Sequence, residues 1–245
     1  DNKDINFQIQ NTKQWIIDFI NILKDNNFDL KIPLIIESTW DYNTLACLLL
    51  SENLFNVKEI NPIITKNYVK HTIRWTKTDK TDAKALANIW LQEKDNLFTF
   101  NKSRNFISIS KKISLIANLE KQIQSLKMTI KNFNNVISNL ELDKSKAVES
   151  IEITIIELGE NIKVLKFEIE ETKLWDSDKN KVDIINSITW VSKYMAIAFY
   201  VSFAYKDFAS KKAMYAFLWF DPKLKDSWNF SGKACISKRW NAYIR

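Results

Sequence analysis

The longest regular pattern of apolar positions in the chain runs from residue 106 to residue 172. Apolar residues recur there in steps of three and four, which is the heptad repeat of a coiled coil. The repeat breaks at the polar stretch ELDKSK, so the pattern predicts a long antiparallel hairpin of two helices with Lys and Glu outside. Its apolar positions are Ile109, Ile113, Ile116, Leu119, Ile123, Leu126, Ile130, Phe133, Ile137 and Leu140, then Val148, Ile151, Ile155, Leu158, Ile162, Leu165 and Ile169.

A different pattern precedes this hairpin. Helical spacing of apolar residues covers residues 12–24, and the β-branched run LKIPLIIE ends at Glu37. Residues 43–54 are helix-like, and NVKEIN is a second candidate strand, closed by Pro62. Residues 77–91 predict another helix, which opens with acidic residues as the helix dipole favours. This alternation of strands and helices predicts an α/β domain.

Three domains are therefore expected. The α/β domain covers residues 1–98, the hairpin residues 99–175, and a mainly α C-terminal domain residues 176–245. The last domain contains the apolar helical stretch MAIAFYVSFAY and a helix around KKAMYAFL. A basic segment follows, which contains Lys223, Lys225, Lys233, Lys238, Arg239 and Arg245.

Charge and cysteine content narrow the class of protein. The 36 Lys and Arg against 29 Asp and Glu give a net charge of +7, which favours polyanionic partners. Cys47 and Cys235 lie far apart, so a disulfide framework and a structural zinc site are not expected, and the expected compartment is the reducing cytosol. No apolar run is long enough to span a bilayer, and no membrane segment is expected.

Glycine and tryptophan occur in unusual numbers. The chain has 2 Gly and 9 Trp, whereas a chain of this size ordinarily carries about 17 glycines. Trp40, Trp219, Trp228 and Trp240 stand in contexts where a turn favours glycine. We hypothesise that the gene comes from an AT-rich lineage that reads UGA as glycine, which fits the heavy use of Lys, Asn and Ile. The alternative is that the tryptophans are real and stack on unpaired bases.

Three carboxylates are candidates for chemistry. Glu37 closes a strand, and Asp79 and Asp82 are three residues apart and so share one face of a helix. Carboxylate oxygens suit Mg²⁺, and such ions promote phosphodiester cleavage. In the alternative interpretation Asp79 caps its helix, Asp82 bonds the first-turn amides and Glu37 is a polar strand end. The single His71 is interpreted as an ordinary surface residue.

Several blocks of the sequence together resemble one family. IIESTWDYNTLACLL, INPIITKNYVK, KTDKTDAKALA, SITWVS, FASKKAMYAFLWFDPK and SWNFSGKACISKRWNAYIR follow the order of motifs in IS110-family transposases, which include the Piv-type DNA invertases. The resemblance implies a RuvC-like, ribonuclease H-like domain whose acidic residues, in the order D-E-D-D, bind Mg²⁺. Glu37, Asp79 and Asp82 match the last three, and the first aspartate is expected upstream of Asp1.

The resemblance also implies a nucleophilic serine near the C-terminus. It matches Ser227, while Ser231-Gly232 is a competing pair. Spacing favours Ser227, because Gly232 then fits the family's next glycine and Ser237-Lys238 its I-S-K block. Expected DNA contacts are Lys77, Lys233, Lys238, Arg239 and Arg245. Tryptophan stands where the family pattern carries glycine at Trp15, Trp40, Trp90, Trp190, Trp219, Trp228 and Trp240.

The expected function is that of an insertion-sequence transposase or site-specific recombinase, which cleaves and rejoins DNA. Its implied partners are double-stranded DNA, a structured guide RNA and further copies of the chain, joined as a dimer or tetramer through the coiled coil. The implied location is the cytoplasm, at the nucleoid. The alternative is a non-catalytic coiled-coil DNA-binding remnant of a transposase, and a junction resolvase is disfavoured because it needs no C-terminal serine block.

Overall fold

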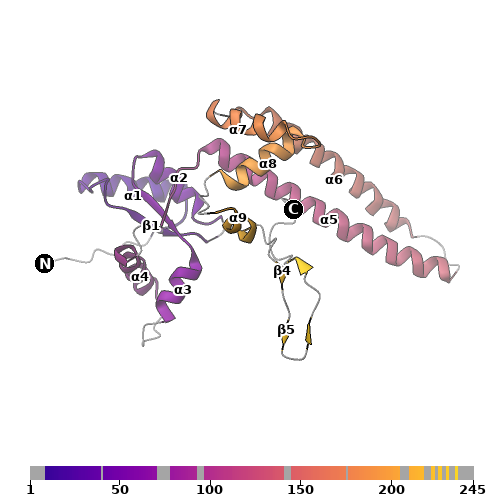
Figure 1. Ribbon diagram of the computed structural model, residues 1–245, viewed down its shortest axis with the longest axis horizontal. Coiled ribbons are helices and arrows are strands. Elements are labelled where there is room, and N and C mark those ends of the chain that lie inside the picture. The colour runs from indigo at the N-terminus through magenta and orange to yellow at the C-terminus, as the bar shows by residue number, and fades with distance from the viewer. Residues whose placement is uncertain are drawn as a thin grey trace. The chain divides into compact units, whose positions relative to one another are not determined.

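The computed structural model describes residues 9–39, 41–70, 78–92, 97–140, 145–174, 176–204 and 210–217, and four two-residue strands between 222 and 236. It divides into two compact units, Asp1–Ser103 and Arg104–Arg245. Figure 1 shows the elements of both, and each unit is described by itself. The domain boundaries at residues 98 and 175 stay predictions.

A small sheet forms the centre of the first unit. Strand β1 (Leu34–Glu37) pairs in parallel with β2 (Val57–Ile60), so that Glu37 lies opposite Ile60, and the two-residue β3 (Phe98–Thr99) pairs antiparallel with β2. Helix α2 (Thr44–Glu52) connects the parallel strands, as such a pair requires a crossover. The two longer strands and α2 agree with the elements expected from sequence, whereas β3 is an addition.

Helices cover both faces of this sheet. Along a strand successive side chains point to opposite faces, and Ile35 and Ile60 contact a cluster that includes Ile89 of α4 (Asp79–Gln92). Helix α3 (Pro62–Lys70) also contributes to that cluster and was not expected from the sequence. The other face carries Val57 and Glu59 and is covered by α2, on which α1 (Lys13–Asp25) packs.

Two long helices dominate the second unit. Helix α5 (Arg104–Asn139) and helix α6 (Lys146–Glu171) lie side by side, and the link between them falls at the expected ELDKSK stretch. The ion pairs Lys112–Glu168 (2.8 Å) and Lys166–Glu120 (3.1 Å) cross between them. Since the partner's residue number falls as the other rises, the helices are antiparallel.

The core of the second unit lies where further helices join the hairpin. Helices α7 (Asp176–Asn186) and α8 (Lys193–Phe203) pack together and α8 contacts α5 and α6. Ile109, Ile116 and Ile169 are completely buried there. Towards the loop the hairpin has two helices alone, and two of the heptad positions, Phe133 and Leu140, are 37% and 61% exposed. Two helices can bury only the stripe between them.

The C-terminal segment contains more strand than expected. After α9 (Lys211–Phe217), β4 (Pro222–Lys223) pairs with β7 (Cys235–Ile236), and β5 (Asp226–Ser227) pairs with β6 (Phe230–Ser231), both antiparallel. The expected basic loop is therefore built in part from strand pairs. Among the described residues, no helix combines the length and apolar character needed to cross a membrane.

One tryptophan adopts an unusual backbone conformation. Trp190, in the connection between α7 and α8, has φ of +74° and a side chain that is 94% exposed. Glycine populates this left-handed region readily, whereas a bulky side chain is strained there. This observation supports the hypothesis of recoded glycine. Trp40, Trp219, Trp228 and Trp240 lie outside the described residues.

Candidate carboxylate site and its surroundings

Glu37 lies at the carboxyl end of β1, on the face of the sheet that α4 covers. It is two residues after Ile35, so the two side chains leave the strand on the same face. Ile35 packs against the cluster of Ile60, Ile89 and Leu97, and α4 contacts β1. Glu37 is partly buried, and it follows the end of the strand where its carboxylate meets both packed side chains and solvent.

Asp82 lies on the face of α4 that meets this strand. It precedes Leu86 by four residues and Ile89 by seven, a spacing that keeps all three on one side of a helix. Leu86 and Ile89 both belong to the cluster that contains Ile35. The packed faces of β1 and α4 therefore carry Glu37 and Asp82, each partly buried.

Asp79 is the first residue of α4, and the side chain of Asp79 lies outside the described part of the structure. The helix begins with a reciprocal cap between two threonines: Thr81 N–H donates to Thr78 Oγ1 (3.2 Å) and Thr78 N–H donates to Thr81 Oγ1 (3.0 Å). This arrangement is a variant of the capping box. The alternative that Asp79 serves as the cap is wrong, because Thr78 occupies that position.

The two described carboxylates have the chemistry of a magnesium site. Oxygen ligands from Asp and Glu are those that Mg²⁺ prefers, usually one or two together with water and substrate phosphate. Within the described residues no group of three or more acidic, His or Cys side chains gathers as a metal site. The structure thus brings together the elements that carry Glu37 and Asp82.

Ser227 lies in β5, directly before the two-residue connection to β6. The register places Ser227 opposite Phe230 and Asp226 opposite Ser231, so the competing serine is on the neighbouring strand. A two-residue hairpin connection favours positive φ and hence glycine, and here it consists of Trp228 and Asn229. Gly-Asn in place of Trp-Asn would suit such a hairpin, in agreement with the recoding hypothesis.

The basic residues expected to contact DNA lie elsewhere in the chain. Lys77, Lys233, Lys238, Arg239 and Arg245 are all outside the described residues, as is His71. Their proposed contacts stay predictions.

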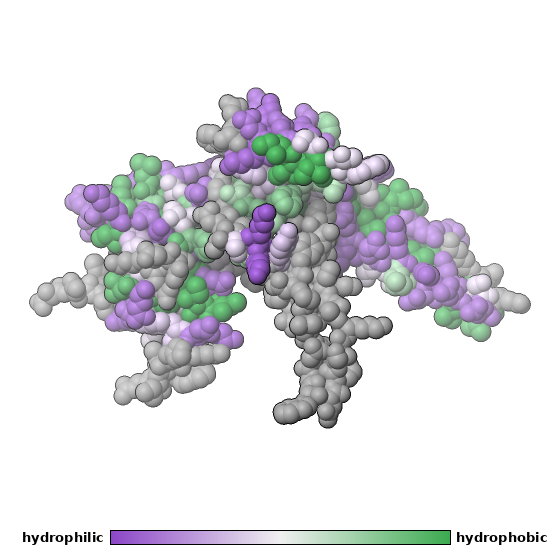
Figure 2. All heavy atoms as spheres, in the orientation of Figure 1, coloured by the Kyte–Doolittle hydropathy of each residue, from purple (hydrophilic) through white to green (hydrophobic). Residues whose placement is uncertain are grey.

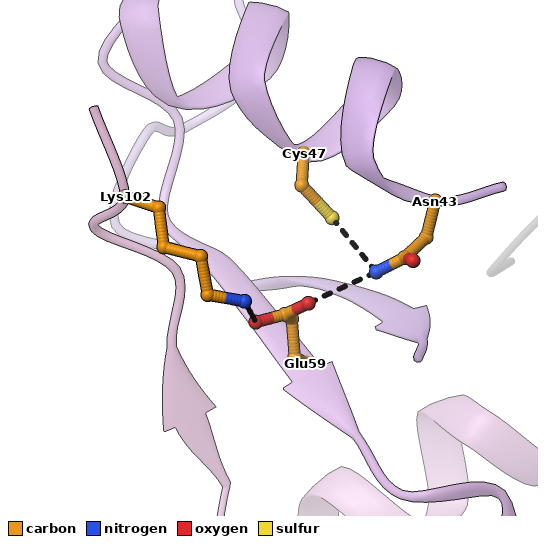
Figure 3. A network of polar contacts seen from close by, with 4 residues as sticks. All are labelled: Asn43, Cys47, Glu59 and Lys102. Atoms are coloured by element: carbon orange, nitrogen blue, oxygen red, sulfur yellow. Dashed lines mark hydrogen bonds and ion pairs between the residues drawn. The ribbon is translucent and has the colours of Figure 1, made fainter. Parts of the chain in front are cut away.

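Behind the sheet, on the face opposite Glu37, lies a polar network that the sequence analysis did not identify (Figure 3). Asn43 Nδ2 donates to Glu59 Oε1 (2.9 Å), and Lys102 Nζ lies 3.0 Å from Glu59 Oε2. Asn43 Nδ2 is also 3.6 Å from Cys47 Sγ. Burial, and secondarily the charge of Glu59, raises the pKa of the Cys47 thiol to about 12. The only sequence signal was a glutamate within the strand-like run NVKEIN.

This network is structural in character, because its cysteine is protonated and enclosed. A nucleophilic cysteine needs a lowered pKa and access to substrate, and Cys47 is fully buried. Its members join α2 and β2 to the residues just before α5. The network therefore supports the strand pair that carries Glu37.

Comparison with known proteins identifies the family. Residues 2–136 match the model of the DEDD transposases of IS110 elements, described as a transposase. No curated protein matches the chain. The matched region contains Glu37, Asp79 and Asp82 and ends within α5, so it does not reach Ser227. Because the match covers more than half of the chain, the protein belongs to the IS110-type family of DEDD transposases.

Proposed function

We propose that this transposase cleaves and rejoins DNA strands with a magnesium-carboxylate site and a serine nucleophile. The observation that carries the proposal is that Glu37 and Asp82 occupy the two packed faces of β1 and α4. A structural carboxylate has no reason to lie beside an apolar cluster unless it gains a partner, because its burial costs free energy. A divalent cation would be such a partner.

Glu37 and Asp82 would hold the ion, together with Asp79. When bound, Mg²⁺ would neutralise phosphate charge and lower the pKa of a coordinated hydroxyl or water. The contribution of the chain is to fix the carboxylates on rigid elements, and the cap formed by Thr78 and Thr81 fixes the start of α4. Sites on strands and helices are positioned more accurately than sites on loops.

Ser227 would form the covalent intermediate. Its Oγ attacks the phosphorus of the scissile phosphodiester and loses its proton, while the bond from phosphorus to the departing strand's oxygen breaks and that oxygen takes up a proton. The resulting phosphoserine conserves the bond energy for transfer to another strand. Its position beside the tight connection between β5 and β6 supports this role, since such a connection is exposed to a ligand as large as DNA.

The substrates and partners follow from this chemistry. Double-stranded DNA is the proposed substrate, with a structured guide RNA as the proposed partner that selects the sites. A net charge of +7 supports contacts to polyanions, and the proposed contacts are Lys77, Lys233, Lys238, Arg239 and Arg245. The assembly is proposed to be a dimer or tetramer joined through the hairpin of α5 and α6.

The proposal is tested in the protein translated from its complete gene, with a DNA substrate carrying the ends of its own element. Glu37→Gln and Asp82→Asn should lower cleavage at least 100-fold at equal Mg²⁺, because each removes charge that the ion requires. Ser227→Ala should abolish the covalent protein–DNA adduct on a denaturing gel, whereas Ser231→Ala should retain it. An adduct that persists in Ser227→Ala, or cleavage that is insensitive to both carboxylate changes, would refute the proposal.

A further inference from the structure

Helix α6 has a second apolar face that its own unit does not cover. Ile153, Ile156, Val164 and Phe167 are 57%, 65%, 56% and 64% exposed. Each residue of a helix turns by about 100°, so these four form one stripe, about 180° away from the buried positions Ile162 and Ile169. Apolar side chains reach the surface along the hairpin in Figure 2. A helix with apolar faces on opposite sides normally has partners on both.

The stripe is symmetric about Glu160. Ile153 and Phe167 lie seven residues before and after it, and Ile156 and Val164 lie four before and after. In an antiparallel helix pair centred on Glu160, each small or large member would meet its counterpart from the other copy. An interface with twofold symmetry must be self-complementary in this way.

Charges flanking the stripe follow the same symmetry. Glu157 and Lys163 are three residues before and after Glu160, so that each glutamate would meet the lysine of the other copy. Glu160 itself would lie near its own counterpart on the axis. That repulsion is offset by Lys163, whose Nζ is 2.8 Å from Glu160 Oε1 in the same helix. Gly159 beside it has open space around its α-carbon and permits close approach.

We infer that the outer face of α6 joins two copies of this chain in an antiparallel, twofold-symmetric pair, with Ile153 against Phe167, Ile156 against Val164 and Glu157 against Lys163. The contact stripe is about 21 Å long, from the rise of a helix. Self-association therefore uses the face opposite the heptad seam, because the seam is already filled by α5 and α8. This deepens the proposed function, on which it rests for the purpose of the assembly.

Analytical ultracentrifugation of the complete chain, without DNA or metal, tests the interface. We expect a reversible dimer. Ile156→Glu should raise its dissociation constant about 30-fold or more, because it buries an unpaired charge at the centre of the contact. The matched control is Ile184→Glu on α7, where an isoleucine is 69% exposed and no change is expected. Circular dichroism should show unchanged helix content in both variants.

Exchange of charges distinguishes this pairing from other dimers. Glu157→Lys and Lys163→Glu should each weaken the dimer, and the double variant should restore it, because opposite charges again face each other. A monomeric parent chain, an unaffected Ile156→Glu dimer or a double variant as weak as the single ones would overturn the inference. Since sedimentation requires no catalysis, an inactive transposase that still dimerises through α6 would refute the proposed chemistry alone.

Discussion

Lys102 and Glu59 form an ion pair, 3.0 Å from Nζ to Oε2, that links the residues before α5 to the central strand β2. The two partners are unequal, because the side chain of Lys102 is 34% exposed and that of Glu59 only 14%. Asn43 holds the second oxygen of Glu59 at 2.9 Å. Loss of the lysine would leave a nearly buried carboxylate with a single donor, whereas loss of the glutamate charge leaves an ammonium that can reach water.

The first prediction follows from this inequality. Lys102→Met should lower the free energy of unfolding of the first unit by about 1–2 kcal/mol, and Glu59→Gln should lower it by less, since the amide can still accept from Asn43 or Lys102. Urea denaturation followed by circular dichroism gives both values, with Lys102→Arg as the control that retains the charge. An equal loss for the two substitutions would contradict the asymmetry.

The second prediction concerns Cys47. Because burial raises the pKa of its thiol from 9.0 to about 12, the thiolate that reacts with alkylating reagents is scarce at pH 8. Iodoacetamide should therefore leave Cys47 unmodified in the folded chain and label it fully in urea, as read by peptide mass spectrometry.

The same pKa shift has a consequence for stability. The unfolded chain loses the thiol proton above its ordinary pKa of 9.0 while the folded chain keeps it to about 12, so stability should fall as the pH rises between these values. The fall should be smaller in Cys47→Ala, which has no thiol to titrate. Rapid labelling of the native protein at pH 8, or identical pH dependence in Cys47→Ala, would contradict this account.

The third prediction concerns Trp190. Its φ of +74° and 94% exposure mean that the side chain adds strain and gains little from packing. Trp190→Gly should stabilise the second unit by about 1 kcal/mol, while Trp190→Ala should not, because alanine keeps the Cβ. Thermal denaturation gives both changes.

Trp15 is the matched control for Trp190, because it lies within α1. Glycine in a helix costs about 1 kcal/mol, so Trp15→Gly should destabilise, opposite in sign to Trp190→Gly. Sequencing of the source gene completes the test. UGA codons at both positions would identify glycine as the encoded residue, whereas UGG codons together with a destabilising Trp190→Gly would refute the recoding hypothesis.

The fourth prediction tests the packing of the hairpin. Ile116 is completely buried and its neighbour Leu115 is 46% exposed. Ile116→Ala should cost about 2–4 kcal/mol, since it leaves a cavity among closely packed side chains, and Leu115→Ala should cost less than about 1 kcal/mol. Chemical denaturation measures both, and similar losses would show that the helices pack with another face.

Local periodicity determined much of the fold. The heptad steps from Ile109 to Ile169 and the break at ELDKSK predict two helices whose bounds match α5 and α6, because an amphipathic helix records its packing face in its own spacing. The β-branched runs likewise predict β1 and β2. Family motifs pointed to Glu37, Asp79 and Asp82, and the family match includes all three.

Tertiary structure alone decided which of these faces meet. Spacing places Asp82 on one side of a helix and Glu37 at the end of a strand, but only the packing of Ile89 against Ile35 and Ile60 assigns both to the same side of the sheet. Nothing local links Glu59 to Lys102, 43 residues away, or forces φ of +74° on Trp190. These features depend on contacts between distant residues, whose free energy exists only once the chain has folded.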